Sequence, residues 1–137
     1  SKKIKSFKEP IYITRPLLPN FDEFQQKIGI FDSRILTNNG IQLKNFEKKL
    51  REFLGVKNVS VFCNGTLGLQ LACKALELKG EVITTPFTFP ATPHSLVWNG
   101  LRPVFCDIEE STFNIDPHKI ELLITDKTSA IMPGAVA

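Results

Sequence analysis

The stretch EVITTPFTFPAT, residues 81–92, decides the fold. Residues 81–85 are predicted to form a short strand, and two prolines stiffen the loop that follows it. A helix is predicted over 93–98, with Thr92 as its N-cap and a proline in its first turn. A strand that leads through a short loop into a helix is the repeating unit of a parallel α/β sheet.

The same alternation of strands and helices continues along the chain on both sides. Further strands are predicted over 59–63, 103–106 and 128–132, and further helices over 21–30, 45–54, 66–79 and from Asp116 onward. This pattern is typical of an α/β fold with a mainly parallel sheet and helices on both of its faces. We expect an irregular N-terminal arm at residues 1–40 and this domain, truncated, at residues 41–137.

Composition and charge limit the classes of function. The chain has 137 residues, of which 42% are hydrophobic and 23% charged, as in an ordinary globular domain. No apolar run approaches the roughly 20 residues that span a bilayer, so no membrane association is expected. Four lysines lie in the first eight residues. Such an arm can touch nucleic acid or a phosphorylated ligand, but a solvated terminus is the simpler interpretation, and we expect no nucleic-acid partner.

The cysteines and histidines do not form a recognisable site. The three cysteines, Cys63, Cys73 and Cys106, contain no CxxC pair, and each lies in or beside an apolar segment. This fits buried, reduced thiols and a cytoplasmic location better than a disulfide or a zinc site. His94 and His118 have no second ligand at metal-binding spacing, so no metal site is predicted.

The sequence Phe62–Thr66, FCNGT, joins a predicted strand to a predicted helix. Its glycine, Gly65, lets the backbone approach a ligand closely, and the free N–H groups of a helix's first turn attract an anion. Thr66 adds a hydroxyl donor. The motif suits one phosphate rather than a dinucleotide, because it has neither GxGxxG nor the lysine of a Walker loop. The alternative is that Asn64 or Thr66 only caps the helix.

Two aromatic residues, Phe87 and Phe89, lie in the loop after the strand over 81–85. An aromatic ring at the carboxyl end of a strand, next to a phosphate site, is placed to stack on a flat heterocycle. Packing of both rings into the core is the alternative interpretation, and the residues alone do not choose between the two.

Several of these segments resemble, in order and separation, the N-terminal part of the DegT/DnrJ/EryC1/StrS sugar aminotransferases. The matching blocks are Asn64–Thr66, Gly80–Thr84, Pro86–Thr92, Pro103–Ile108 and Thr112–Pro117, with Leu36–Gly40 and Phe46–Glu47 upstream. The resemblance runs from about Arg34 to Pro133, and ordered blocks are more specific than any single one. After Pro133 the sequence Gly134–Ala137 departs from the family's pattern.

The resemblance implies a partial large domain of the fold-type I (aspartate aminotransferase-like) pyridoxal 5'-phosphate (PLP) enzymes, which are usually homodimers. It implies that Gly65 and Thr66 hold the cofactor phosphate, that Phe89 stacks on the pyridine ring, and that Phe87 belongs to the core. The implied activity transfers an amino group from a donor such as glutamate to a nucleotide-linked keto sugar, in amino-sugar, cell-surface polysaccharide or antibiotic-sugar biosynthesis.

The residues that would carry out this chemistry are not in the chain. PLP enzymes need a lysine that binds the cofactor covalently and an acidic group beside the ring nitrogen, and in the family both lie beyond the position of Ala137. We therefore assign no catalytic residue and expect this chain alone to be inactive. Three alternatives stay open: a PLP-dependent sugar dehydratase, in which histidine replaces the lysine; a non-catalytic protein that binds phosphate or caps a partner; and an unrelated phosphate- or nucleotide-binding module.

Overall fold

The computed structural model describes residues 9–12, 14–29, 34 and 38–134. Contacts divide the chain into two compact units, residues 1–57 and 58–137. The lysine-rich arm and the predictions that fall on Leu36, Thr37 and residues 135–137 lie outside the described residues. The boundary between an arm and a PLP-binding domain at residue 40 stays a prediction.

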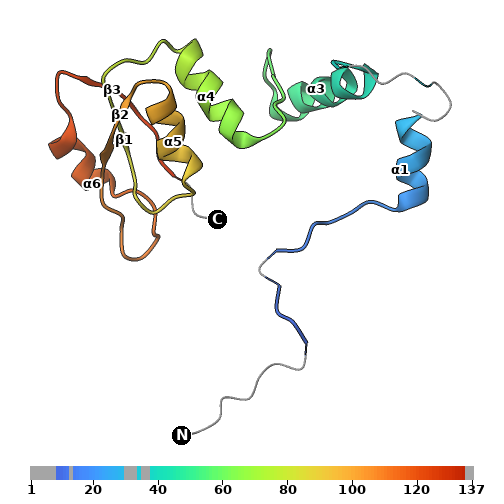
Figure 1. Ribbon diagram of the computed structural model, residues 1–137, viewed down its shortest axis with the longest axis horizontal. Helices are drawn as coiled ribbons and strands as arrows, with labels where there is room; N and C mark the ends of the chain where they lie inside the picture. Colours follow the sequence, from blue (N-terminus) through green and yellow to red (C-terminus); the bar gives the residue numbers. More distant parts are fainter. Residues whose placement is uncertain (1–8, 13, 30–33, 35–37, 135–137) are drawn as a thin grey trace, which may run out of the picture. The chain divides into compact units, whose positions relative to one another are not determined.

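The first unit contains two amphipathic helices (Figure 1). α1 spans Phe21–Ile28, and the side chain of Asn20 caps it by accepting hydrogen bonds from backbone N–H groups of the first turn. α3 spans Ile41–Leu54 and ends at Gly55, whose φ of 65° lies in the left-handed region. Both helices are confirmed, although α3 begins earlier than the predicted 45. Neither helix buries any of its residues.

The second unit is built on a parallel sheet with the strand order β2-β1-β3. Its strands are β1 (Glu81–Thr84), β2 (Arg102–Phe105) and β3 (Thr128–Ile131). Val82 of β1 lies opposite Pro103 of β2 and Ala130 of β3. Because β1 has a neighbour on each side, it is buried along its whole length. The predicted parallel α/β sheet is confirmed, and β1, β2 and β3 correspond to three of the predicted strands.

The strand predicted over 59–63 is wrong. These residues are described, and none of them belongs to a strand. An apolar run becomes a strand only when another strand supplies its hydrogen-bond partners. In the described part of the chain, the sheet consists of β1, β2 and β3 alone. The local sequence pattern indicates the apolar run but contains no information about a partner.

Three helices accompany the sheet. They are α4 (Gly65–Ala75), α5 (Ala91–Trp98) and α6 (Pro117–Ile120), which continues into a 3-10 turn over Glu121–Leu123. Figure 1 shows α5 and α6 on opposite sides of the strands, as the fold class predicts. The core lies between α4, α5 and β1, and its buried apolar residues are Cys73, Val82, Leu96 and Leu101. No helix in the described ranges is long and apolar enough to cross a membrane.

α4 is shorter than predicted, and the assignment of Gly80 as its C-cap is wrong. The helix is capped at Leu76, and the Leu78 N–H donates to the carbonyl of Cys73 at 3.2 Å. Gly80 has a φ of 77°, and a Cβ there would come within 2.5 Å of the carbonyl oxygen of Lys127. Glycine is therefore needed because the turn before β3 approaches closely, a contact that the local pattern does not contain.

Candidate cofactor site

The first turn of α4 presents unpaired hydrogen-bond donors. Asn64 caps the helix, because its Oδ1 accepts a hydrogen bond from the Leu67 N–H at 2.9 Å. Among the described residues, no hydrogen bond engages the N–H groups of Gly65 and Thr66 or the hydroxyl of Thr66. The capping interpretation is therefore right for Asn64, but it leaves three neighbouring donors available.

These donors suit an anion. A Cβ at Gly65 would meet nothing within 4 Å, so open space lies beside the turn, whereas a Cβ at Gly68 would come within 3.4 Å of the ring of Phe62. The amino end of a helix carries partial positive charge, and its N–H groups bind phosphate. Two backbone amides and the Thr66 hydroxyl form a donor set that fits the phosphate group of PLP.

Threonine hydroxyls hold the loop between β1 and α5, residues 85–90. The Oγ1 of Thr85 accepts a hydrogen bond from the Phe87 N–H at 3.1 Å. The hydroxyls of Thr88 and Thr92 share a hydrogen bond of 3.1 Å. These contacts fix the backbone of the loop in addition to its two prolines.

The predicted N-cap role of Thr92 is wrong. Pro90 occupies the N-cap position of α5, and Thr92 lies inside the helix. Its N–H donates to the carbonyl of Phe89 at 3.0 Å. The hydroxyl of Thr92 finds its partner in Thr88, four residues earlier, rather than at the helix end.

The two phenylalanines of this loop both face solvent. Phe89 is 78% exposed, so its ring is free to stack on a flat ligand. Phe87 is 48% exposed, and the expectation that it belongs to the core is therefore wrong. Its ring instead contacts Phe113 from the loop after β2, with centroids 5.7 Å apart.

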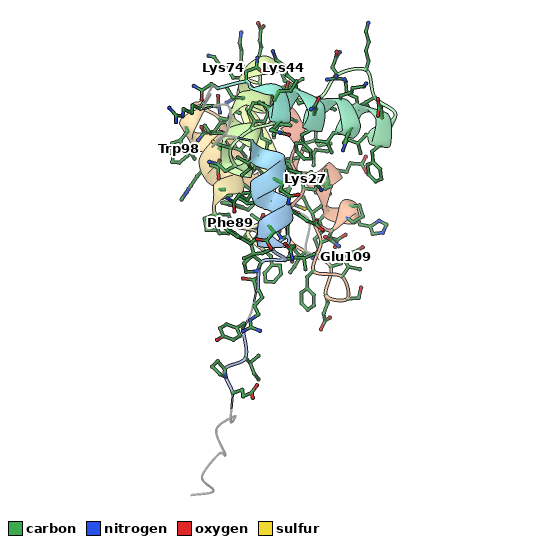
Figure 2. All side chains as sticks on the ribbon, turned by 90° about the vertical axis from the view of Figure 1, so that its right-hand side faces the viewer. Lys27, Lys44, Lys74, Phe89, Trp98 and Glu109 are labelled. Carbon is green, nitrogen blue, oxygen red and sulfur yellow. The ribbon has the colours of Figure 1, made fainter. Side chains whose placement is uncertain are left out.

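The loops after β1 and β2 meet at one end of the sheet. Figure 2 shows Phe89 and Glu109, one from each loop, toward one end of the second unit, and Lys74 and Trp98 toward the other. Parallel strands bring their carboxyl ends to the same edge, which is where ligands of open α/β sheets bind. The aromatic loop therefore lies at the edge expected for a site.

Gly65 and Thr66 lie at the start of α4, and Phe89 lies in the loop that leads into α5, the helix that packs against α4. α4 contacts α5, and the side-chain amide of Asn99 donates to the carbonyl of Gln70 at 3.1 Å. No hydrogen bond or ring contact within the described ranges joins Phe89 to Gly65 or Thr66. The structure therefore does not bring the predicted cofactor residues into direct contact, and their shared role stays a prediction.

Charges close the loop after β2, residues 107–116. The Nζ of Lys119 lies 2.8 Å from Asp107 and 3.6 Å from Asp116. The hydrogen bond from Lys119 lowers the pKa of Asp107, and the same bond raises the pKa of Lys119. The Cys106 thiol lies beside the Asp116 carbonyl of the same loop. Its pKa is raised, mainly by burial and to a smaller extent by the negative charge of Asp116.

A buried carboxylate at the opposite edge of the sheet has no signal in the sequence. Glu81 is only 6% exposed, and its two oxygens accept hydrogen bonds from Arg102 at 3.0 Å and from the Thr125 hydroxyl at 2.8 Å. Glu81 is the first residue of β1 and lies at the amino end of the strand. Since this cluster lies away from the carboxyl ends, it supports the sheet rather than the candidate site.

The thiols form no site either. Cys73 and Cys106 are free and buried as predicted, but Cys63 is exposed, so its prediction as a buried thiol is wrong. Cys63 lies in the segment before α4 that forms no strand, and therefore no sheet covers it. Burial raises the pKa of the Cys73 thiol. Within the described ranges, no group of three or more His, Cys, Asp or Glu side chains could hold a metal ion.

Solved structures show the class to which this fold belongs. DesI, solved in the presence of its TDP-sugar product, matches 93% of this chain and 33% of its own, with a TM-score of 0.81 and 38% identity. The Bacillus subtilis protein ntda, solved with bound cofactor PMP, matches 93% of this chain and 32% of its own, with a TM-score of 0.74 and 31% identity. The fold is that of the fold-type I PLP-dependent aminotransferases, present here in part.

The family follows from the sequence comparison. The profile of the DegT/DnrJ/EryC1/StrS aminotransferase family matches residues 20–137, and the chain belongs to this family. A dTDP-4-amino-4,6-dideoxy-D-glucose transaminase of Escherichia coli is 52% identical over 124 residues, which are 90% of this chain and 33% of that protein. The chain spans about a third of the length of the relatives that it matches.

Proposed function

We propose that the complete protein transfers an amino group from a donor such as glutamate to a nucleotide-linked keto sugar, with PLP as its cofactor. The observation that carries the proposal is the 52% identity to the Escherichia coli transaminase over 90% of the chain. The unpaired donors of Gly65 and Thr66 at the start of α4 support it, because they fit a phosphate group.

The substrate class can be narrowed within the same proposal. The Escherichia coli relative is named for dTDP-4-amino-4,6-dideoxy-D-glucose, and DesI was solved with a TDP-sugar product. We therefore assign a dTDP-linked 6-deoxy sugar as the substrate, with the amino group placed on C4. The sugar-binding residues themselves are not assigned in this chain.

The residues of this chain would anchor and orient the cofactor. The N–H groups of Gly65 and Thr66 and the Thr66 hydroxyl would hold its phosphate, and Phe89 would cover one face of its ring. PLP, when bound, withdraws electrons from the carbon that carries the amino group. No residue here is assigned to proton transfer, so this segment contributes binding and orientation.

We also propose that the complete protein is a homodimer and lies in the cytoplasm. Large apolar side chains exposed on α1, α3 and α4 support association, namely Phe21, Phe24, Ile41, Phe46, Phe53, Leu54, Leu67 and Leu71. The free, buried thiols of Cys73 and Cys106 suit a reducing compartment. Sedimentation equilibrium tests the first statement, and cell fractionation tests the second.

An amination assay with the complete gene product tests the function. The protein is incubated with PLP, glutamate and dTDP-4-keto-6-deoxyglucose, and the sugar nucleotide is analysed by mass spectrometry. We expect one aminated sugar for each 2-oxoglutarate released, and no product without glutamate. Loss of water from the sugar without use of glutamate would indicate a dehydratase instead. Absence of both reactions and of PLP binding would favour a non-catalytic phosphate-binding protein.

A further inference from the structure

The loop after β2 holds one bulky residue in a conformation that glycine adopts more readily. Phe113 has a φ of 58°, which is a genuine outlier for a large side chain. Phe113 is 49% exposed, so burial in the core does not compensate for the strained backbone. A conformation of this kind persists only where the surrounding structure enforces it.

The surrounding contacts do enforce it. The ends of the loop are joined by the bridge between Ile108 and Ile115 and by the ion pairs of Lys119. Its interior is closed by short backbone hydrogen bonds, from Glu109 N–H to Asn114 O, Phe113 N–H to Glu109 O and Asp116 N–H to Asp107 O, each 2.9 Å long. The loop is therefore a rigid support from which the Phe113 ring projects.

The ring of Phe113 meets the loop that carries the candidate stacking residue. Its centroid lies 5.7 Å from that of Phe87, with the planes tilted by 36°, a favourable geometry for an aromatic pair. Phe87 is tied to Thr85 through its N–H and precedes Phe89 by two residues. Phe87 is about half exposed even with this ring contact in place, so the core does not hold its side chain.

We propose that Phe113 is a positioning residue that, through its ring contact with Phe87, fixes the loop presenting Phe89 to the cofactor. Without the contact, Phe87 and the backbone up to Phe89 would have more conformations available. In this proposal, the left-handed backbone at Phe113 orients its ring toward Phe87 in the neighbouring loop. The role toward PLP rests on the proposed function, whereas the role toward the loop does not.

The test uses three variants of the complete gene product. Phe113→Gly removes the ring and suits the left-handed backbone, Phe113→Ala removes the ring but keeps the backbone cost, and Phe113→Tyr keeps the ring. Hydrogen exchange of the amides of residues 87–89, 91 and 92 is measured without PLP, and the PLP dissociation constant is measured by absorbance titration. Thermal unfolding shows whether each variant is folded.

We expect Phe113→Gly to raise both the exchange rate at Phe87 and the PLP dissociation constant by a factor of about 3 to 10. Phe113→Tyr should remain close to the wild type in both. Phe113→Gly should unfold at a temperature no lower than Phe113→Ala, because glycine relieves the left-handed strain. Weaker PLP binding by Phe113→Gly than by Phe113→Tyr, at a temperature at which both variants are folded, is a result that a purely structural role does not give.

Two results would overturn the proposal. One is unchanged exchange at residues 87–89, 91 and 92 in Phe113→Gly, and the other is faster exchange with an unchanged PLP dissociation constant. A different pattern separates it from the function proposed above. If the wild type binds no PLP but Phe113→Gly still loosens the loop, the cofactor assignment fails while the support of the loop by Phe113 stands.

Discussion

At the residue scale, Lys119 joins the two ends of the loop after β2 through ion pairs. Its ammonium group contacts Asp107 at 2.8 Å and Asp116 at 3.6 Å. Lys119 and Asp107 are both exposed to solvent, so screening keeps the contribution of the pair to the free energy of unfolding small. The pH dependence of this contribution nevertheless has a definite sign.

We expect Asp107→Asn to lower the urea midpoint of the complete protein near neutral pH but not in strong acid. The hydrogen bond from Lys119 holds the pKa of Asp107 below its usual range in the folded state. The stabilisation is therefore complete above the ordinary carboxyl pKa and is lost as the pH falls through the lowered value. Because the pKa of Lys119 is raised, it is also lost as the pH rises through that higher value.

Glu110→Gln is a matched control for this measurement. It removes one negative charge from the same loop, and Glu110 is exposed and belongs to no ion pair in the described part of the chain. Urea unfolding of both variants and the wild type across the pH range gives the comparison. Equal effects of the two substitutions, or a difference that does not change with pH, would contradict the assignment.

Single residues can be predicted from the sequence when their partner is close in the chain. The capping of α4 by Asn64 needs only the next turn of helix, and it is found as the sequence allows. The sequence predicts Thr92 at the helix end, whereas its hydroxyl shares a hydrogen bond with that of Thr88. Glu81 pairs with Arg102, 21 residues away, and no local pattern points to such a partner.

At the scale of elements, the turn into β1 depends on a close approach between two backbones. The Cα of Gly80 faces the Lys127 carbonyl, and Gly80 also has a positive φ. Gly100 has a similar φ of 72°, but a Cβ there would meet nothing within 4 Å. Substitution of the two glycines therefore separates two contributions to the free energy of unfolding, that of the left-handed backbone and that of the close contact with Lys127.

We expect Gly80→Ala to destabilise the complete protein by about 2 kcal/mol or more, through both costs. Gly100→Ala should cost about 1 kcal/mol, through the left-handed backbone alone. Urea unfolding of the two variants measures the difference. Equal destabilisation would show that the Lys127 carbonyl moves away freely, contrary to the tight turn described here.

Elements are predictable from the sequence as far as their signals are local. Short apolar runs that alternate with helical segments indicate β1, β2, β3 and the helices between them. The strand over 59–63 fails because a strand needs a hydrogen-bonded neighbour, which periodicity does not supply. The end of α4 is misplaced for a related reason, since the role of Gly80 is set by Lys127, far along the chain.

At the scale of the whole molecule, the chain holds only part of a fold. Both outer strands, β2 and β3, have a second edge that no strand covers in the described part of the chain. Free edges and exposed apolar side chains favour association. We expect residues 1–137, produced alone, to form oligomers or aggregates in sedimentation velocity at micromolar concentration. A single monomeric species would contradict this expectation.

The candidate site is predictable from the sequence only in part. Residue type suggests the phosphate motif at Gly65 and Thr66, whereas the choice of stacking over core packing for Phe89 comes only from the family resemblance. Neither signal indicates the contact of Phe113 with Phe87, because it joins loops that follow different strands. The pairing of strands into a parallel sheet is what brings these loops to one edge.

A PLP titration tests most directly the claim that this chain anchors the cofactor. The complete gene product is titrated with PLP and followed by absorbance, as wild type, Thr66→Val and Thr66→Ser. We expect the wild type to bind, Thr66→Val to raise the dissociation constant about 10- to 100-fold through loss of a hydroxyl donor to a charged phosphate, and Thr66→Ser to restore it. A wild type that does not bind PLP, or a Thr66→Val variant that binds equally well, would contradict the claim.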